Sequence, residues 1–166
     1  MNIEHEIENP LFGYSKGQTM QHCSNTPLFQ NLVRYSVSCS KSGAERWDKK
    51  SPGKNCGCCY PCLMRRAALY SIDLDDGSNY NRDAISSSDI LHAKARGRDL
   101  RCILKNLNRY ANGKINLFKE VLLPGQILTS YQFRTLEKVI SDGLEEMKAL
   151  IVDKGCKEVK KYAGLK

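Results

Sequence analysis

The sequence lacks the signatures of membrane-spanning and secreted proteins. No uninterrupted apolar stretch approaches the ~18 residues that a membrane-spanning helix needs. The first ten residues contain three acidic side chains and no basic segment, which is unlike a secretory signal peptide. We also find no internal repeat and no low-complexity tract. These absences argue against a membrane or exported protein, so we expect a cytoplasmic one.

The chain does contain enough apolar side chains for a core, together with an excess of basic residues. Of its 166 residues, 41% are hydrophobic, and 26 Lys and Arg against 18 Asp and Glu give a net charge of +8. The charge comes in blocks, because residues 41–70 and 91–119 are basic whereas 71–90 are acidic. Blocks of one sign indicate separate surfaces on one small protein.

The first 72 residues are predicted to form short elements joined by turns. Ser15 and Gln18 have the spacing of a capping box, which predicts a short helix to about residue 22 or 23. The alternation over 32–37 predicts a short extended segment. Residues 41–55 are charged and contain Pro-Gly, which is typical of an exposed loop. Strong helix formers over 63–72 predict a helix.

An acidic, turn-rich segment at 73–83 has almost nothing to bury and is predicted to link this part to a helical extension over 84–166. There, Ser88 is expected to cap a helix through about Tyr110, weakly interrupted by Gly97. A short apolar helix over 115–123 follows and ends at Pro-Gly. Ser130 is expected to cap a last long helix, whose apolar residues recur every three or four positions up to residue 151.

Eight cysteines in a chain without an export signal should be reduced thiols, and five of them cluster. Cys56, Cys59 and Cys62 have the spacing C-x2-C-x2-C, and Cys39 precedes them across a loop. Four thiolates can close a tetrahedral Zn²⁺ site that contributes folding free energy directly. We therefore predict these four as ligands of one structural zinc ion, with Gly57 allowing the tight turn between them.

Other interpretations of the cluster stay open at this stage. The spacing C-x2-C-x2-C with a remote Cys also occurs in iron–sulfur proteins, although the Cys-Pro that would normally follow is absent. Cys58 lies between two ligands and is expected to be spare, or to act as a redox thiol if nearby bases lower its pKa. The isolated Cys23, Cys102 and Cys156 are expected to be small buried hydrophobes.

Three stretches together resemble a known family. NPLFGYSKGQTMQ, VRYSVSCS and CGCCYPCLMR are similar to the C-terminal portion of the 7-cyano-7-deazaguanine synthases (QueC-like) of queuosine biosynthesis. The match covers about residues 9–70. It implies the C-terminal half of an α/β, Rossmann-like ATP-pyrophosphatase of the adenine-nucleotide α-hydrolase type, with an added helical tail. It also implies a four-cysteine zinc knuckle at 39–62 within a synthase unit at 1–72.

The same resemblance implies roles for basic residues. Lys16 would face the ATP phosphates, or else be a solvated first-turn lysine, and Arg65 or Arg66 would lie near the substrate or brace the knuckle. These enzymes use ATP, with Mg²⁺, and ammonia to convert a carboxylated deazaguanine into its nitrile. The longer loop and the helical tail look more like the related protein of Qat anti-phage defence systems.

The family's Ser-Gly-Gly-x-Asp-Ser loop, which cradles the ATP pyrophosphate, is absent from this sequence. The chain alone is therefore not expected to be an active ligase. Its expected partners are a separate N-terminal ATP-pyrophosphatase half or other defence-system proteins. Apolar surface on residues 1–40 should then be exposed where the missing half would pack.

A zinc-knuckle module that binds nucleic acid is the alternative function. Lys94, Arg98, Arg101 and Lys105 would form one basic stripe on a helix over 88–110, beside the basic knuckle. Such a stripe suits phosphate binding, with an affinity that falls steeply with salt. A solvated helix face would carry the same pattern, and aromatic residues for base stacking do not interleave with the bases.

Overall fold

The described part of the computed structural model, residues 8–24, 26–41, 54–125 and 128–165, is mainly helical and contains no strand. Its one β-type pairing is an isolated parallel bridge between Asn55 and Tyr80. The elements are α1 (Lys16–Ser24), α2 (Pro27–Val33), α4 (Tyr60–Tyr70), the 3₁₀ helix η1 (Gly77–Asn79), α5 (Asp89–His92), α6 (Arg98–Ala111), α7 (Leu117–Leu122), α8 (Ser130–Lys154) and α9 (Lys157–Tyr162). None of these helices is long and apolar enough to cross a membrane.

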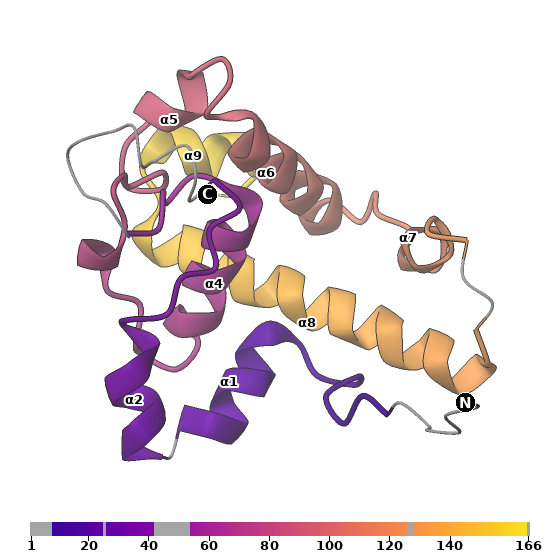
Figure 1. Cartoon of the computed structure of the whole chain (residues 1–166). Coiled ribbons are helices and arrows are strands. Elements are labelled where there is room, and N and C mark those ends of the chain that lie inside the picture. Colours follow the sequence, from indigo (N-terminus) through magenta and orange to yellow (C-terminus); the bar gives the residue numbers. More distant parts are fainter. Residues whose placement is uncertain (1–7, 25, 42–53, 126–127, 166) are drawn as a thin grey trace, which may run out of the picture.

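Helix α4 lies at the centre of the fold and packs against α1 and α8 (Figure 1). It confirms the helix predicted over 63–72 but begins three residues earlier, because Pro61 suits a first helical turn, where no N–H is needed. Leu63, Ala67 and Leu69 of α4 are buried. The core they enter also contains Met147, Leu150 and Ile151 of α8.

Helix α8 is the predicted long C-terminal helix, with its cap one residue earlier than expected. Thr129 accepts from the Gln132 backbone N–H, and the Gln132 side chain accepts from the Thr129 N–H. This reciprocal capping box starts the helix at Ser130, so Ser130 is its first residue rather than its cap. The short apolar helix predicted over 115–123 is confirmed as α7, which Asn116 caps.

The helix predicted from Ser88 to about Tyr110 is confirmed at both ends, with Ser88 as the N-cap of α5 and α6 running to Ala111, but it is not continuous, because the chain turns between α5 and α6. The Arg101 guanidinium donates to the carbonyl oxygens of Leu91, Ala93 and Lys94 at 2.6, 2.9 and 2.7 Å. A Cβ atom on Gly97 would lie 2.1 Å from the Ile90 carbonyl oxygen, so this tight turn needs glycine. The Arg101 side chain thus satisfies carbonyl groups at the end of α5 and in the turn, of which only Ala93 also accepts the hydrogen bond from the residue four positions later, Gly97.

The N-terminal part confirms one local prediction and contradicts another. Ser15 and Gln18 form the expected capping box, with hydrogen bonds of 2.9 and 3.1 Å, and start α1 at Lys16. The extended segment predicted over 32–37 is wrong at its start, since α2 continues to Val33 and turns follow it. Thr26 at the cap and Pro27 in the first turn begin that helix.

The predicted linker over 73–83 has more to bury than expected. Tyr80 is only 7% exposed and enters the core cluster. The buried side chain of Asp75 accepts two hydrogen bonds from Arg66 of α4, each 3.2 Å long. The division of the chain at 73–83 stays a prediction, yet α4 on one side of it and α8 on the other contribute to one core.

Apolar side chains on the N-terminal part are exposed, as predicted. Leu28 is 67% exposed, Leu32 53% and Tyr35 76%. All three belong to α2 or to the turn that follows it, and no residue of α2 is buried. Figure 1 shows α2 at the edge of the molecule, away from α6 and α9.

Candidate metal centre

The sulfur atoms of Cys39, Cys56, Cys59 and Cys62 all lie within 4.8 Å of one another, and these four cysteines could bind a metal ion. Cys56, Cys59 and Cys62 are fully buried, and Cys39 is half-buried. The sequence had predicted this same set of four from its spacing.

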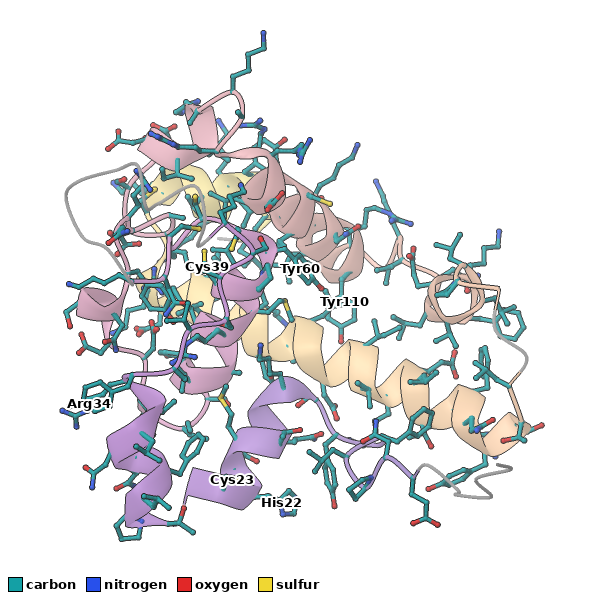
Figure 2. The ribbon with its side chains drawn as sticks, viewed as in Figure 1. His22, Cys23, Arg34, Cys39, Tyr60 and Tyr110 are labelled. Carbon is teal, nitrogen blue, oxygen red and sulfur yellow. The ribbon has the colours of Figure 1, made fainter. Side chains whose placement is uncertain are left out.

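Local geometry brings the four sulfurs together at the start of α4. Cys59 is the N-cap of α4 and Cys62 lies in its first turn, so both sulfurs are held at one helix end. Cys56 precedes them across a turn in which Gly57 has a φ of +79°. A Cβ atom on Gly57 would lie 2.0 Å from the Arg82 carbonyl oxygen, so the turn requires glycine, as predicted. Cys39 approaches from the segment after α2 (Figure 2).

The sulfur separations fit four ligands of a single ion. The Sγ atoms of Cys39 and Cys59 lie 3.9 Å apart, those of Cys56 and Cys62 3.8 Å, and those of Cys59 and Cys62 3.3 Å. A tetrahedron with Zn–S bonds of about 2.3 Å has edges of about 3.8 Å. The four thiols therefore need only small shifts to surround one tetrahedral ion.

Hydrogen bonds and burial within the cluster favour the thiolate form of Cys56 over those of Cys39 and Cys62. Hydrogen bonds from Cys58 and Cys62 hold the pKa of the Cys56 thiol far below its usual value. The hydrogen bond to Cys56, followed by burial, raises the pKa of Cys62. Burial raises the pKa of Cys39, opposed by backbone N–H groups of Lys41 and Cys56 that donate to its sulfur at 3.3 and 3.5 Å. A cation bound here would offset the cost of the further thiolates, and its binding would release protons.

Cys58 is spare, as predicted, but it does not have the features of a redox thiol. It is 2% exposed, and its Sγ lies 3.8 Å from that of Cys56. The hydrogen bond it donates to Cys56 and its burial raise the pKa of its thiol, whereas the sequence had suggested a lowered value. Reactive cysteines are accessible and have a low pKa, so this expectation is wrong.

Asn55 braces the segment that carries Cys39, a role that sequence reasoning missed. It is 2% exposed, its side-chain oxygen accepts from the Ser38 N–H at 3.1 Å, and its amide donates to the Ser36 carbonyl oxygen at 3.4 Å. An asparagine directly before the first cysteine of the run was the available signal, because its side chain can hydrogen-bond to two backbone groups at once.

Arg65 and Arg66 both brace the surroundings of the knuckle. Arg65 is 4% exposed and donates to the Ser36 hydroxyl at 2.7 Å and to the Val33 carbonyl oxygen. Arg66, equally buried, pairs with Asp75 and with Asp83, and its guanidinium lies 5.3 Å from the centre of the Tyr80 ring. A direct contact of either arginine with a substrate stays a prediction.

Lys16 is exposed at the first position of α1, outside the cysteine cluster. Although the residue is exposed overall, protein atoms surround part of its side chain, and this partial desolvation, followed by the positive charge of Arg65, lowers its pKa. The Glu146 carboxylate of α8 accepts hydrogen bonds from the Ser15 hydroxyl and from the Gly17 N–H, the latter 3.1 Å long. It thus occupies the N-terminus of α1, a contact across 131 positions that the sequence did not reveal.

The isolated cysteines lie apart from the centre. Cys23 and Cys102 are exposed and Cys156 is half-buried, so the expectation that they are buried hydrophobes is wrong for the first two. Figure 2 shows Cys23 beside His22 at the far end of α1 from Cys39. His22 contacts the Tyr14 ring edge-on, with centroids 4.5 Å apart.

The basic stripe expected on a helix over 88–110 does not form as predicted. Lys94 lies in the turn before α6 and is not part of a helix. Arg101 uses its guanidinium to cap carbonyl groups, whereas the Arg98 side chain is 83% exposed. Of the four predicted members of the stripe, Lys94 is therefore outside the helix and the Arg101 guanidinium is occupied by carbonyl groups. Arg98 and Lys105 are the two that lie on α6 and make no such contact with carbonyl groups.

Comparison with known proteins finds no family model, curated protein or solved structure that matches this chain.

Proposed function

We propose that the chain is the zinc-binding C-terminal part of an ATP-dependent carbon–nitrogen ligase similar to the 7-cyano-7-deazaguanine synthases. We assign it to an anti-phage system of the Qat type rather than to queuosine biosynthesis. The observation that supports this most is the convergence of Cys39, Cys56, Cys59 and Cys62, the four cysteines in the segments that resemble the family. The capped start of α1 at Ser15 and Lys16 supports it further.

Zinc is the ion that this donor set favours. Four thiolates leave no open coordination position, which is typical of a structural rather than a catalytic zinc site. In a four-iron cluster each cysteine binds a different iron, so its sulfurs lie farther apart than the 3.3 to 3.9 Å seen between neighbouring sulfurs here. The ion would tie the start of α4 to the segment after α2.

The exposed apolar side chains of α2 are where we expect a complementary α/β half to pack. That half would supply the Ser-Gly-Gly-x-Asp-Ser loop and hence bind ATP and Mg²⁺. In the assembled enzyme Lys16 would approach the ATP phosphates, and its desolvated ammonium would gain from their negative charge. Arg65 would hold the segment between α2 and the knuckle in position next to the substrate.

Reconstitution with an N-terminal half tests this proposal. The zinc-loaded chain would be mixed with the ATP-binding half of a 7-cyano-7-deazaguanine synthase, or with the product of the reading frame directly upstream. Pyrophosphate release from ATP would be measured with ammonia and a carboxylated deazaguanine. We expect release by the mixture, none by either part, and a large loss with Lys16→Ala. A complete, unrelated upstream gene and an inactive mixture would contradict the proposal.

Nucleic-acid binding remains the second hypothesis, supported by the net charge of +8 but not by a continuous stripe. Titration with RNA and DNA at two salt concentrations tests it directly, since phosphate contacts make affinity fall steeply with salt. If no salt-sensitive binding is detected, this alternative is rejected.

A further inference from the structure

A cavity of about 390 Å³ lies between the start of α1 and helices α4, α6, α7 and α8, and none of the four clustered cysteines lines it. This volume is within the range of small-molecule sites. Its walls are mainly apolar and include Met64, Ile103, Ile115, Val139, Leu144 and Met147. Tyr60, labelled in Figure 2 at the start of α4, also lines it. A molecule with an apolar body would bury that body here.

Gly143 shows how α8 keeps this cavity open. It lies in the interior of α8, where glycine weakens a helix relative to alanine, and it lines the cavity. Apart from its chain neighbours and the adjacent backbone of α8, no heavy atom of the described residues lies within 4 Å of the position that its Cβ would take. A larger side chain would therefore fit at Gly143 without a clash, but it would project into the cavity.

The charged groups lining the cavity leave one cation available. Glu120 is paired with Arg109, whose Nη2 lies 3.3 Å from its carboxylate. The Ser15 hydroxyl donates to Glu146. Among the described residues, no side chain or carbonyl group forms a hydrogen bond or ion pair with the Lys16 ammonium. An anionic group on the ligand would thus find an unpaired ammonium at one end of an apolar cavity.

We propose that this cavity binds a small amphipathic anion, of the class of medium-chain carboxylates, with the chain against α4, α6 and α8 and the carboxylate on Lys16. This proposal does not rest on the ligase function, although both use Lys16, because Gly143 and most of the wall lie outside the segments that resemble the synthases. Its test needs neither ATP nor a partner half, so either proposal can fail while the other holds.

Octanoate and its neutral counterpart 1-octanol are the probes, titrated calorimetrically into the full, zinc-loaded chain. We expect saturable octanoate binding that weakens at least about tenfold in Gly143→Leu, which fills the cavity. Lys16→Met should weaken octanoate about tenfold and leave 1-octanol unchanged, because only octanoate uses the ammonium. Thermal unfolding of each variant would show that it is folded.

Ala149→Leu is the matched control, since it adds the same side chain to an exposed position of α8 that does not line the cavity. It should bind octanoate like the wild type. The proposal is overturned if the wild type shows no saturable binding, if Gly143→Leu binds as well as Ala149→Leu, or if Lys16→Met affects both probes alike. Should Gly143→Leu fail to fold, the comparison of the two probes on Lys16→Met still decides.

Discussion

The Sγ atoms of Cys39 and Cys59 lie 3.9 Å apart, although the two residues are 20 positions apart in the chain. This contact closes the loop between the segment after α2 and the start of α4. A metal ion at this point would link two parts that otherwise share few apolar contacts, since no residue of α2 is buried. The stability of this half of the protein should therefore depend on the ligand set.

Cys59→Ser should abolish stoichiometric zinc binding and unfold residues 30–41 and 54–72, because a hydroxyl replaces a fully buried ligand at the N-cap of α4. Cys58→Ser is the matched control. It changes the neighbouring buried thiol but should keep the metal. Metal content after dialysis and hydrogen exchange over 30–41 and 54–72 measure both effects. Equal zinc content and equal protection in the two variants would contradict the assignment of Cys59 as a ligand.

Gly57→Ala should destabilise the protein by about 1–3 kcal/mol or more, because φ at this position is +79° and the added methyl would lie 2.0 Å from the Arg82 carbonyl oxygen. Gly77→Ala provides the comparison, since nothing lies within 4 Å of its Cβ position. Chemical denaturation at fixed zinc concentration gives both values. A Gly57→Ala protein as stable as Gly77→Ala would show that the turn is not constrained as described.

The ionised carboxylate of Asp83 should stabilise the folded protein at pH values above about 4. Burial opposes its ionisation, but the N–H groups of Ile85 and Ser86 and the Arg66 guanidinium lower the pKa of its carboxyl to about 2. Because this folded-state pKa is below the unfolded value of about 4, the stabilisation is present above pH 4 and is lost as the pH falls towards 2.

The variant Asp83→Asn isolates that contribution. At pH 7 it should be less stable by about 1 kcal/mol, a modest value because the Asp83 side chain is 43% exposed. The difference in free energy of unfolding from the wild type should shrink between pH 4 and pH 2. Protonation of the thiolates affects both proteins and cancels in the comparison. A difference that does not change with pH would contradict the lowered pKa.

Glu146→Ala should destabilise the protein by about 1–2 kcal/mol, because it removes the carboxylate that binds Ser15 and the Gly17 N–H at the N-terminus of α1. Glu145→Ala, the control, removes only a partner of Lys148 on the exposed side of α8 and should cost about 0–1 kcal/mol. Thermal unfolding of the two variants compares them. Equal losses would mean that the contact between α8 and α1 contributes nothing measurable.

The features that the sequence predicted correctly are those that depend on residues close together in the chain. Spacing alone predicted the four cysteines, because three of them lie in one short run and the fourth across one loop, as is typical of a structural zinc site. The Ser15 capping box and the turn at Gly57 depend on single residues whose conformational preferences are strong.

Contacts between distant residues account for the wrong predictions. The helix expected over 88–110 breaks because Arg101 captures carbonyl groups of the preceding turn, which no propensity reveals. Tyr80 is buried although its segment is polar and turn-rich, because Arg66 pairs with Asp75 and Asp83 around it. The bracing role of Asn55 was missed for the same reason, because it depends on hydrogen bonds to the backbone of Ser36 and Ser38, which lie across a loop.

The central claim, that Cys39, Cys56, Cys59 and Cys62 bind one zinc ion, is tested most directly by elemental analysis of the purified full chain. We expect about one zinc per chain and no inorganic sulfide. The single variant Cys39→Ser should lose the metal, as Cys59→Ser should. Brown protein that contains iron and sulfide, or protein that retains no metal after purification in zinc-containing medium, would contradict it.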